Sequence, residues 1–390
     1  MTPGKGAYLR QITTSLSTQM RSVDVGRELE GSSPPSVFIG SHAYPKVYAG
    51  PVIAAFHGDT KILDSPESWI PAGISQDEII RCRLSLVRGK QRVAADDIDN
   101  PFVEKLREIA LSSSSVESDV TFETPPTGMM FSEESSPHGP SARMEQFEIE
   151  KGRWDPDLER VYHDTDLGAS GAVIDLHRQG VPFSSIQKAF SAGTMGTGRK
   201  RKLVPTRWSI TACDTIIGDD LLSRVRQHSP IDCYRVHEFD SLNNHYAVLL
   251  IPTVWQYEWI EAFLHVLGRE EMIFADHEGH RKKHGYSPVG GCYYSCRMAV
   301  LDALEKEGKQ AGAIILREAR RGYIPLGVFN VRENVRHAMA SPPKEFDGIS
   351  GALHYLTAGF SLPPARFYGE STLLSGLGKG YQANLSAFCS

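Results

Sequence analysis

The sequence lacks the dense cysteine spacing of a secreted, disulfide-stabilised domain. Its 390 residues contain six scattered cysteines: Cys82, Cys213, Cys233, Cys292, Cys296 and Cys389. Secreted scaffolds of that kind concentrate many cysteines in a short chain. We therefore expect reduced thiols.

Long apolar runs are also missing. The first twenty residues contain no apolar segment typical of a secretion signal. No uncharged apolar run reaches the ~18 residues that a transmembrane helix requires. These absences predict a cytoplasmic protein that makes no membrane contact.

A surplus of positive charge is the third feature that is absent. The formal net charge is −5, whereas proteins that coat nucleic acid with their whole surface usually carry a positive field. Any contact with DNA must therefore be local.

The composition that is present predicts a folded protein of mixed α/β (α+β) class. Hydrophobic residues make up 41% and charged residues 23% of the chain, with 35 glycines and 23 prolines, which is typical of globular rather than disordered or coiled-coil chains. The length exceeds one ordinary core. We expect one large region with a smaller, intimately packed companion.

Several elements are predicted from periodicity. Ala313–Leu316 and Leu326–Val331 are predicted as buried strands, and Tyr293–Glu307 and Arg332–Ala340 as helices. In residues 254–267, Trp255, Trp259 and Phe263 recur at every fourth position before Gly268, which predicts a helix that buries an aromatic stripe.

Capping signals and composition add three further expectations. Asp164 to Asp166 offer an N-cap to a helix that Gly180 can end, and Ser184 with Gln187 forms a capping-box pattern for the next helix. Residues 111–142 are rich in Ser, Pro and Glu without periodicity, which predicts a segment that is mostly a flexible loop.

The last residues match the peptide pattern that binds DNA sliding clamps. Gln382 is followed by Leu385 three positions on and by Phe388 three positions later. Residues with this spacing lie on one face of a tight helical turn, so Leu385 and Phe388 could fill one apolar pocket beside the Gln382 amide. Cys389 replaces the usual second aromatic residue, which predicts modest affinity. The alternative is an amphipathic terminus packed on its own domain.

A cationic block follows a glycine-rich loop. No acidic residue occurs in residues 191–213, which contain the cations Arg199, Lys200, Arg201, Lys202 and Arg207. Glycines let backbone N–H groups approach phosphate while the cations neutralise its charge, so we expect these five residues to contact the DNA backbone. A solvated surface turn is the alternative. A nucleotide-binding P-loop does not fit, because the required Lys and Ser or Thr are missing.

Carboxylates and metal ligands carry weaker hypotheses. Asp164, Asp166 and Asp214 are the candidates for a metal-dependent nuclease, together with Asp59, Asp64 and Glu67, although the two aspartates near residue 165 suit helix caps equally well. A zinc site built from His277, His280, His284, Cys292 and Cys296 lacks the paired close spacing of structural zinc sites. We predict no metal and no cofactor.

Several stretches resemble the archaeal Nre family of DNA-damage-response proteins. The strongest is the twelve-residue block Arg201–Ala212, and the others are Pro35–Gly40, Gly50-Pro51, Asp64–Trp69, Asp164–Leu167, Gly290–Tyr294, Gln310-Ala311, Leu316–Glu318, Pro325–Val328 and Val331–Glu333. The resemblance covers the chain from about Ser33 onward. Many relatives begin with a four-cysteine segment similar to a zinc finger, but no cysteine precedes Cys82 here, so no role of that finger is carried over.

The resemblance implies DNA repair and association with the sliding clamp PCNA, and it supplies no reaction. It divides the chain into an N-terminal region, 1–285, a C-terminal region, 286–375, and a flexible tail, 376–390, with the clamp motif. The leading hypothesis is a repair factor recruited by the clamp, which contacts DNA through a local basic patch. One alternative is an enzyme that acts on damaged DNA or on a nucleotide cofactor, and the other is a non-enzymatic scaffold that joins the clamp to other repair factors.

Overall fold

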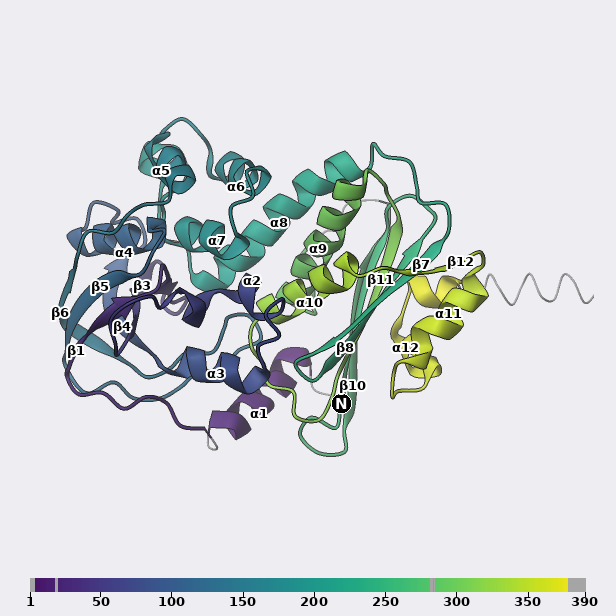
Figure 1. The fold of residues 1–390 in the computed structure, drawn as a ribbon, viewed down its shortest axis with the longest axis horizontal. Coiled ribbons are helices and arrows are strands. Elements are labelled where there is room, and N and C mark those ends of the chain that lie inside the picture. Colours follow the sequence, from purple (N-terminus) through teal and green to yellow (C-terminus); the bar gives the residue numbers. More distant parts are fainter. Residues whose placement is uncertain (1–3, 18–19, 281–282, 284, 378–390) are drawn as a thin grey trace, which may run out of the picture. The chain divides into compact units, whose positions relative to one another are not determined.

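The computed structural model describes residues 4–17, 20–280, 283 and 285–377, drawn in colour in Figure 1. The chain forms two compact units. Unit 1 comprises Met1–Ile12, Gly218–Ile324 and Asn330–Ser390, and unit 2 comprises Thr13–Ile217 and Pro325–Phe329. The predicted regions 1–285 and 286–375 are continuous in sequence, unlike these units, and that division stays a prediction.

Unit 2 contains a six-stranded sheet in the order β1-β5-β6-β4-β3-β2. All neighbouring strands are antiparallel except β4 and β6, which are parallel. The strands are β1 (Glu28–Ser33), β2 (Val37–Ile39), β3 (Lys46–Ala54), β4 (Leu86–Ala94), β5 (Val116–Phe122) and β6 (Ser141–Ile149). The helices are α2 (Pro66–Trp69), α3 (Gln76–Leu84), α4 (Pro101–Leu111), α5 (Pro156–His163), α6 (Ala169–Arg178) and α7 (Phe183–Ser191), with the 3-10 turns η1 (Lys61–Asp64) and η2 (Gly198–Lys200).

The two faces of β3 and β4 have different environments. Val47, Ala49 and Val87 point to one face and pack against α4 in the main core of unit 2. On the other face, Val52 and Leu86 pack under Leu63 of η1. Successive side chains of a strand alternate between faces. Every second residue after Leu86 in β4, and every second residue before Val52 in β3, therefore also lies on this second face.

Unit 1 contains a second six-stranded sheet in the order β10-β9-β11-β8-β7-β12, in which only β9 and β11 are parallel. Helices α11 and α12 cover one face, and α9 packs on the other through Tyr257 and Tyr293 (Figure 1). The strands are β7 (Tyr234–Ser241), β8 (Asn244–Ile251), β9 (Tyr257–Leu264), β10 (Glu271–Glu278), β11 (Gly312–Ala319) and β12 (Lys344–Phe346). The helices are α9 (Gly291–Glu307), α10 (Phe329–Ala340), α11 (Ile349–Ala358) and α12 (Pro364–Glu370). Helices α1 (Lys5–Ser17) and α8 (Thr206–Val225) contribute residues to both units, as does α10 through Phe329.

A buried ion pair lies inside unit 1. The side chain of Arg317 on β11 is fully buried and lies 3.0 Å from the Glu261 carboxylate, which also pairs with Lys5. Arg317 donates a 2.9 Å hydrogen bond to Asn244 as well. Its guanidinium carbon lies 4.8 Å from the ring centroid of Tyr323. A carboxylate of the protein itself therefore pairs with the Arg317 guanidinium.

The mixed α/β class is confirmed, as are three elements. Tyr293–Glu307 lies in α9, Ala313–Leu316 in β11, and Arg332–Ala340 in α10. The helix expected at residues 254–267 is wrong, because this segment contains strand β9. Residues four apart share a face in a helix and in a strand, and β9 is buried on both faces, so no alternation distinguished the two.

The strand expected at Leu326–Val331 is also wrong, because helix α10 begins at Phe329. Gly327 has φ of +96°, a left-handed conformation that does not continue a strand. A Cβ atom there would lie 2.6 Å from the carbonyl carbon of Ser135. The segment is buried by close backbone packing rather than by sheet pairing.

The remaining local predictions had mixed outcomes. Residues 111–142 form a loop only in part, since Val116–Phe122 is β5 with alternating burial. The helix after Asp164 is confirmed as α6, but its N-cap is Gly168, and the N-cap of α7 is Pro182 without a capping box. In the described part of the chain, no helix is long and apolar enough to cross a membrane.

Candidate functional site

Four cations occupy the uncovered part of the second face of the unit 2 sheet. Arg88, Lys90 and Arg92 alternate along β4, and Arg143 of β6 is paired in register with Lys90. Tyr48 of β3 is paired with Arg92. Residues opposite each other on neighbouring strands share a face, so these five side chains form one surface, here called the cationic face.

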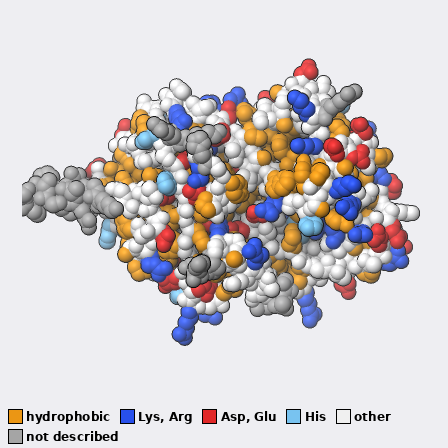
Figure 2. Space-filling model, turned by 180° about the vertical axis from the view of Figure 1, so that it is seen from behind, with side chains coloured by type: hydrophobic (Ala, Val, Ile, Leu, Met, Phe, Trp, Pro, Cys, Tyr) orange, Lys and Arg blue, Asp and Glu red, His pale blue; other side chains and the backbone are white. Residues whose placement is uncertain are grey.

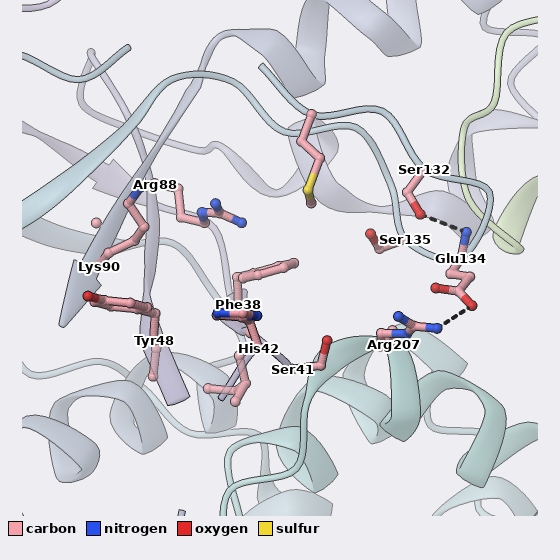
Figure 3. Close-up of a pocket in the computed structure, with 15 residues that line it drawn as sticks. Phe38, Ser41, His42, Tyr48, Arg88, Lys90, Ser132, Glu134, Ser135 and Arg207 are labelled. Carbon is pink, nitrogen blue, oxygen red and sulfur yellow. Dashed lines mark hydrogen bonds and ion pairs between the residues drawn. The ribbon is translucent and has the colours of Figure 1, made fainter. Parts of the chain in front are cut away.

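A pocket of about 320 Å³ opens at one end of this face. In Figure 3, Arg88, Lys90 and Tyr48 lie on one side of the pocket and Ser132, Ser135, Glu134 and Arg207 on the other, with Phe38 between them. Its walls come from β2 and the residues after it, β3, β4, the 123–140 loop and the start of α8. The lining residues are Phe38, Ile39, Gly40, Ser41, His42, Tyr48, Ala49, Arg88, Gly89, Lys90, Met130, Ser132, Glu134, Ser135 and Arg207.

Arg88 is a cation without a countercharge. Its Nε and Nη1 atoms are buried and have no hydrogen-bond partner among the described residues. The guanidinium carbon lies 4.3 Å from the centroid of the Phe38 ring. Burial lowers the pKa of Arg88 to about 10, because removal from water disfavours the charged form. Arg88 as a whole is half-buried, and the burial of these two nitrogen atoms is costly unless an anion compensates the charge.

Lys90 adds a second positive charge beside Arg88. Burial lowers the pKa of Lys90, and repulsion from Arg88 and Arg143 lowers it further. Like charges at close range disfavour the protonated form. By contrast, the partly buried Lys105 of α4 lies 2.7 Å from the Glu148 carboxylate. The four cations of the cationic face form no ion pair within the described part of the chain.

The opposite wall of the pocket contains one compensated charge pair. Arg207 of α8 lies 2.7 Å from the Glu134 carboxylate. The backbone N–H of Glu134 donates a 3.0 Å hydrogen bond to the Ser132 hydroxyl, which orders this part of the 123–140 loop. Both interactions are drawn in Figure 3. The net charge of the pocket walls is therefore positive, and it is concentrated at Arg88 and Lys90.

A close approach of two backbones supports the floor of the cationic face. A Cβ atom at Gly50 of β3 would lie 1.9 Å from the carbonyl oxygen of Gly89 on β4. Only glycine fits at such a contact. Gly50 thus lets β3 and β4 hold Tyr48 and Arg88 on the same surface.

The cationic block predicted from the sequence lies outside the cationic face, and its members make different contacts. Lys200 and Lys202 are exposed. Arg201 is 9% exposed and donates hydrogen bonds to the carbonyl oxygens of Gly196, Tyr162 and Asp164. Arg207 pairs with Glu134, and the side chain of Arg199 lies outside the described residues.

The three aspartates considered first for a nuclease have different environments. Asp164 accepts hydrogen bonds from the backbone N–H groups of Asp166 and Leu167. Asp166 is exposed and Asp214 is fully buried. Within the described residues, none of these three aspartates belongs to a cluster with metal-ligand geometry.

Two further acids considered with them form structural contacts. Asp64 makes ion pairs with Arg83 and Lys188, at 2.5 Å and 3.0 Å. Burial alone would raise the pKa of Asp64, but these two cations hold it well below its usual value. Glu67 accepts hydrogen bonds from the backbone and hydroxyl of Ser184.

Among the residues considered for zinc, His277, His280 and Cys296 belong to no cluster with metal-ligand geometry in the described part of the chain. His280 contacts the carbonyl oxygen of Trp255 at 3.1 Å. Cys292 and Cys296 are buried on α9. His284 lies outside the described residues.

The clamp-type motif, Gln382, Leu385, Phe388 and Cys389, also lies outside the described residues. The chain just before it is held firmly in unit 1. The Glu258 carboxylate accepts hydrogen bonds from the backbone N–H groups of residues 372–374 and from the Ser371 hydroxyl. Leu374 is fully buried.

Charges on the surface are mixed. Figure 2 shows acidic and basic side chains interspersed over the face that it displays, with hydrophobic side chains between them. The absence of a continuous basic surface in that view agrees with the net charge of −5. Where charges are mixed in this way, a small group of cations without carboxylate partners is a better indicator of an anion-binding site than the overall charge.

The sequence reasoning missed Phe38, Tyr48, Arg88, Lys90 and Arg143. Two signals for them were present. The pattern Arg-x-Lys-x-Arg in residues 88–92 places three cations on one face of a strand. Phe38 and Gly50 lie within stretches that carry the family resemblance. Neither signal reveals a pocket, because the 123–140 loop has no periodicity that fixes its position.

Comparisons with known proteins agree on one family. The family model described as "Archaeal Nre, N-terminal" matches residues 8–266, and "Archaeal Nre, C-terminal" matches residues 278–388. The chain is 36% identical over 392 residues to DNA repair protein NreB of Archaeoglobus fulgidus, covering 99% of this chain and 98% of that protein. It is 33% identical to DNA repair protein NreA of the same organism, covering 86% of each chain. It is 29% identical to DNA repair protein NreA of Haloferax volcanii, covering 90% of this chain and 88% of that protein.

No solved structure matches the chain. The family assignment therefore rests on sequence, and both family models together cover nearly its whole length. The chain belongs to the archaeal Nre family.

Proposed function

We propose that this protein acts in DNA repair, binds DNA through a small group of surface cations, and is recruited to the sliding clamp PCNA through its C-terminal motif. The observation that carries the DNA-binding part is the cationic face, whose four cations have no carboxylate partner in the described chain. Relatives aligned over most of their length are named DNA repair proteins.

DNA contact through the cationic face follows from its charge and accessibility. Arg92 and Arg143 are exposed, and a cation without an internal carboxylate partner gains most from a phosphate. Lys200 and Lys202 are exposed as well and form the second proposed contact. Arg201 donates to three backbone carbonyl groups, so its proposed contribution is to hold the neighbouring lysines in place.

Recruitment by the clamp follows from the spacing of the terminal motif. Gln382, Leu385 and Phe388 have the separation that places an amide and two apolar side chains on one face of a short helical turn. Residues 371–374 are bound by Glu258, so the motif follows a segment fixed on the folded protein.

The DNA-binding part is tested by salt-dependent affinity for a gapped duplex. The double variant Arg92→Gln with Arg143→Gln should weaken binding and reduce the slope of log K against log salt by about two, since two phosphate contacts are lost. Lys151→Gln is the matched control, because Lys151 is exposed and lies outside the face. An unchanged slope in the double variant would contradict DNA binding through this surface.

The clamp part is tested by calorimetry with the full chain and the cognate clamp. Leu385→Ala with Phe388→Ala should abolish binding, because both apolar contacts are removed. Cys389→Phe should tighten binding about tenfold if the second aromatic recovers ~1.4 kcal/mol. Equal affinity of the parent and the double-alanine variant would show that this motif does not dock.

A further inference from the structure

We propose that the pocket beside the cationic face holds one phosphate-bearing nucleotide unit, with its phosphate next to Arg88 and Lys90 and its base toward Phe38 and Tyr48. This inference deepens the proposed function, since it names the chemical group that the DNA-binding surface recognises. It requires that the nucleotide be unpaired, because a paired and stacked base cannot enter a pocket.

The phosphate position follows from uncompensated charge. Arg88 and Lys90 line the pocket side by side, and the described chain supplies no carboxylate to either. The acid on the opposite wall, Glu134, is already paired with Arg207. An anion bound between Arg88 and Lys90 would relieve their mutual repulsion and the cost of burying Arg88. Phosphate suits this position, since guanidinium and ammonium groups are its usual partners.

The base position follows from the apolar part of the lining. Phe38 and Met130 form walls without charge, and Tyr48 adds an aromatic ring with a polar hydroxyl. A site for inorganic phosphate alone would not need this apolar surface. The volume of about 320 Å³ is at the lower end of pockets for small ligands, ~300–1,000 Å³. One nucleotide fits this combination of charge, ring surface and size.

The source that the geometry favours is a single DNA strand rather than a free nucleotide. Arg92 and Arg143 lie on the same sheet face as Arg88 but outside the pocket lining. The Arg143 guanidinium donates a 2.7 Å hydrogen bond to the Tyr48 hydroxyl, which places it at the edge of the pocket. A backbone that continues from the bound nucleotide would meet these exposed cations. Surfaces that combine aromatic rings with a track of cations are typical of single-strand binding.

The experiment compares a fluorescent twelve-residue oligo-dT with free dTMP on the full-length protein. Lys90→Gln removes one charge in the pocket, and Lys151→Gln removes one exposed charge elsewhere. We expect Lys90→Gln to weaken oligo-dT binding about fivefold to tenfold and Lys151→Gln to change it by less than about twofold. Tyr48→Leu should weaken binding about tenfold through the lost ring. Saturable dTMP binding that Lys90→Gln weakens equally, without tighter binding of oligo-dT, would support the nucleotide and identify the free form as its source.

A second measurement does not depend on folding of the variants. An oligonucleotide with one 5-iododeoxyuridine should, after irradiation, crosslink to a peptide that contains Phe38 or Tyr48 of the parent protein. If instead Lys90→Gln binds both ligands as the parent does, and crosslinks map only near Lys200 and Lys202, the pocket proposal is overturned while the proposed DNA binding stands. If the parent binds dTMP in the pocket but no DNA, the proposed DNA binding fails and the nucleotide site survives.

Discussion

Two arginines that pack against aromatic rings, one in each unit, differ in how their charge is compensated. Arg317 in unit 1 lies 4.8 Å from the ring of Tyr323 and pairs with Glu261. Arg88 in unit 2 lies 4.3 Å from the ring of Phe38, and the described chain provides no acid for it. A buried cation needs an anion wherever it sits. The protein supplies that anion in unit 1, and a ligand is left to supply it in unit 2.

The difference matters for how each residue contributes to stability and binding. A complete internal pair stabilises one arrangement of side chains and offers nothing to a ligand. An incomplete pair leaves binding energy available, since the cost of burying the cation has already been met during folding. The following predictions test whether the two arginines differ in this way.

The largest effect should come from removing the internal anion of Arg317. Glu261→Gln would leave Arg317 and Lys5 without their shared carboxylate and should lower the free energy of unfolding by ~3–5 kcal/mol. Arg88→Gln should change it by no more than ~1 kcal/mol, because no internal pair is lost. Urea unfolding of both variants measures the contrast, and an equal loss for Arg88→Gln would break it.

A second internal pair allows the same contrast to be followed with pH. The pKa of Asp64 is held below its usual value by Arg83 and Lys188. A carboxyl with a lowered folded pKa stabilises the protein above its unfolded pKa of ~3.9 and loses this contribution as pH falls further. Asp64→Asn should therefore cost ~3 kcal/mol at neutral pH, and the difference from the parent should shrink below about pH 4. Thermal melts at several pH values would show a constant difference if Asp64 were unpaired.

The third prediction concerns the stabilisation of the protein by a bound oligonucleotide. Oligo-dT at a hundred times its dissociation constant should stabilise the parent protein by ~2.7 kcal/mol. Arg88→Gln should lose most of this gain, because the ligand no longer completes a charge pair. Differential scanning fluorimetry with and without oligo-dT measures the gain. Full retention in Arg88→Gln would mean that the ligand binds elsewhere.

The smallest expected effect concerns the proton on Lys90. Burial and the neighbouring arginines lower the pKa of Lys90, so it loses its charge at a lower pH than an exposed lysine, whose pKa is ~10.4. Oligo-dT affinity should fall with rising pH by up to about fivefold, which corresponds to the loss of one contact with a binding free energy of ~1 kcal/mol. Lys90→Arg should show a smaller decline, because only Arg88, whose pKa is also lowered, still loses charge at high pH. A pH profile identical to that of the parent would exclude Lys90 as a cause.

The sequence predicted those elements whose pattern fits a single periodicity. Residues 293–307 and 332–340 are helical as expected, and 313–316 form part of β11. Residues 254–267 failed because β9 is buried on both faces and its aromatic residues recur at a spacing that helix and strand share. Residues 326–331 failed because tertiary packing around Gly327, rather than local preference, determines their path.

The pocket was beyond sequence reasoning for a different reason. Phe38, Tyr48 and Arg88 come from three strands, and their meeting depends on the register of β2 with β3 and of β3 with β4. No local pattern encodes that order. The cationic block at 199–202 was visible because it is contiguous, yet one of its members, Arg201, is buried against backbone carbonyl groups.

The hydrogen bonds of Glu258 attach residues 372–374 to the folded unit 1, and this attachment limits how far the C-terminal motif can lie from that unit. Gln382 follows the buried Leu374 by eight positions, and a fully extended chain spans at most ~3.6 Å per position. The glutamine could then lie no more than ~29 Å from Leu374. A clamp that holds the motif would keep Leu374 of unit 1 within that distance. Inserting residues between Leu374 and Gln382 would increase the distance without altering the Glu258 contact or the clamp contact.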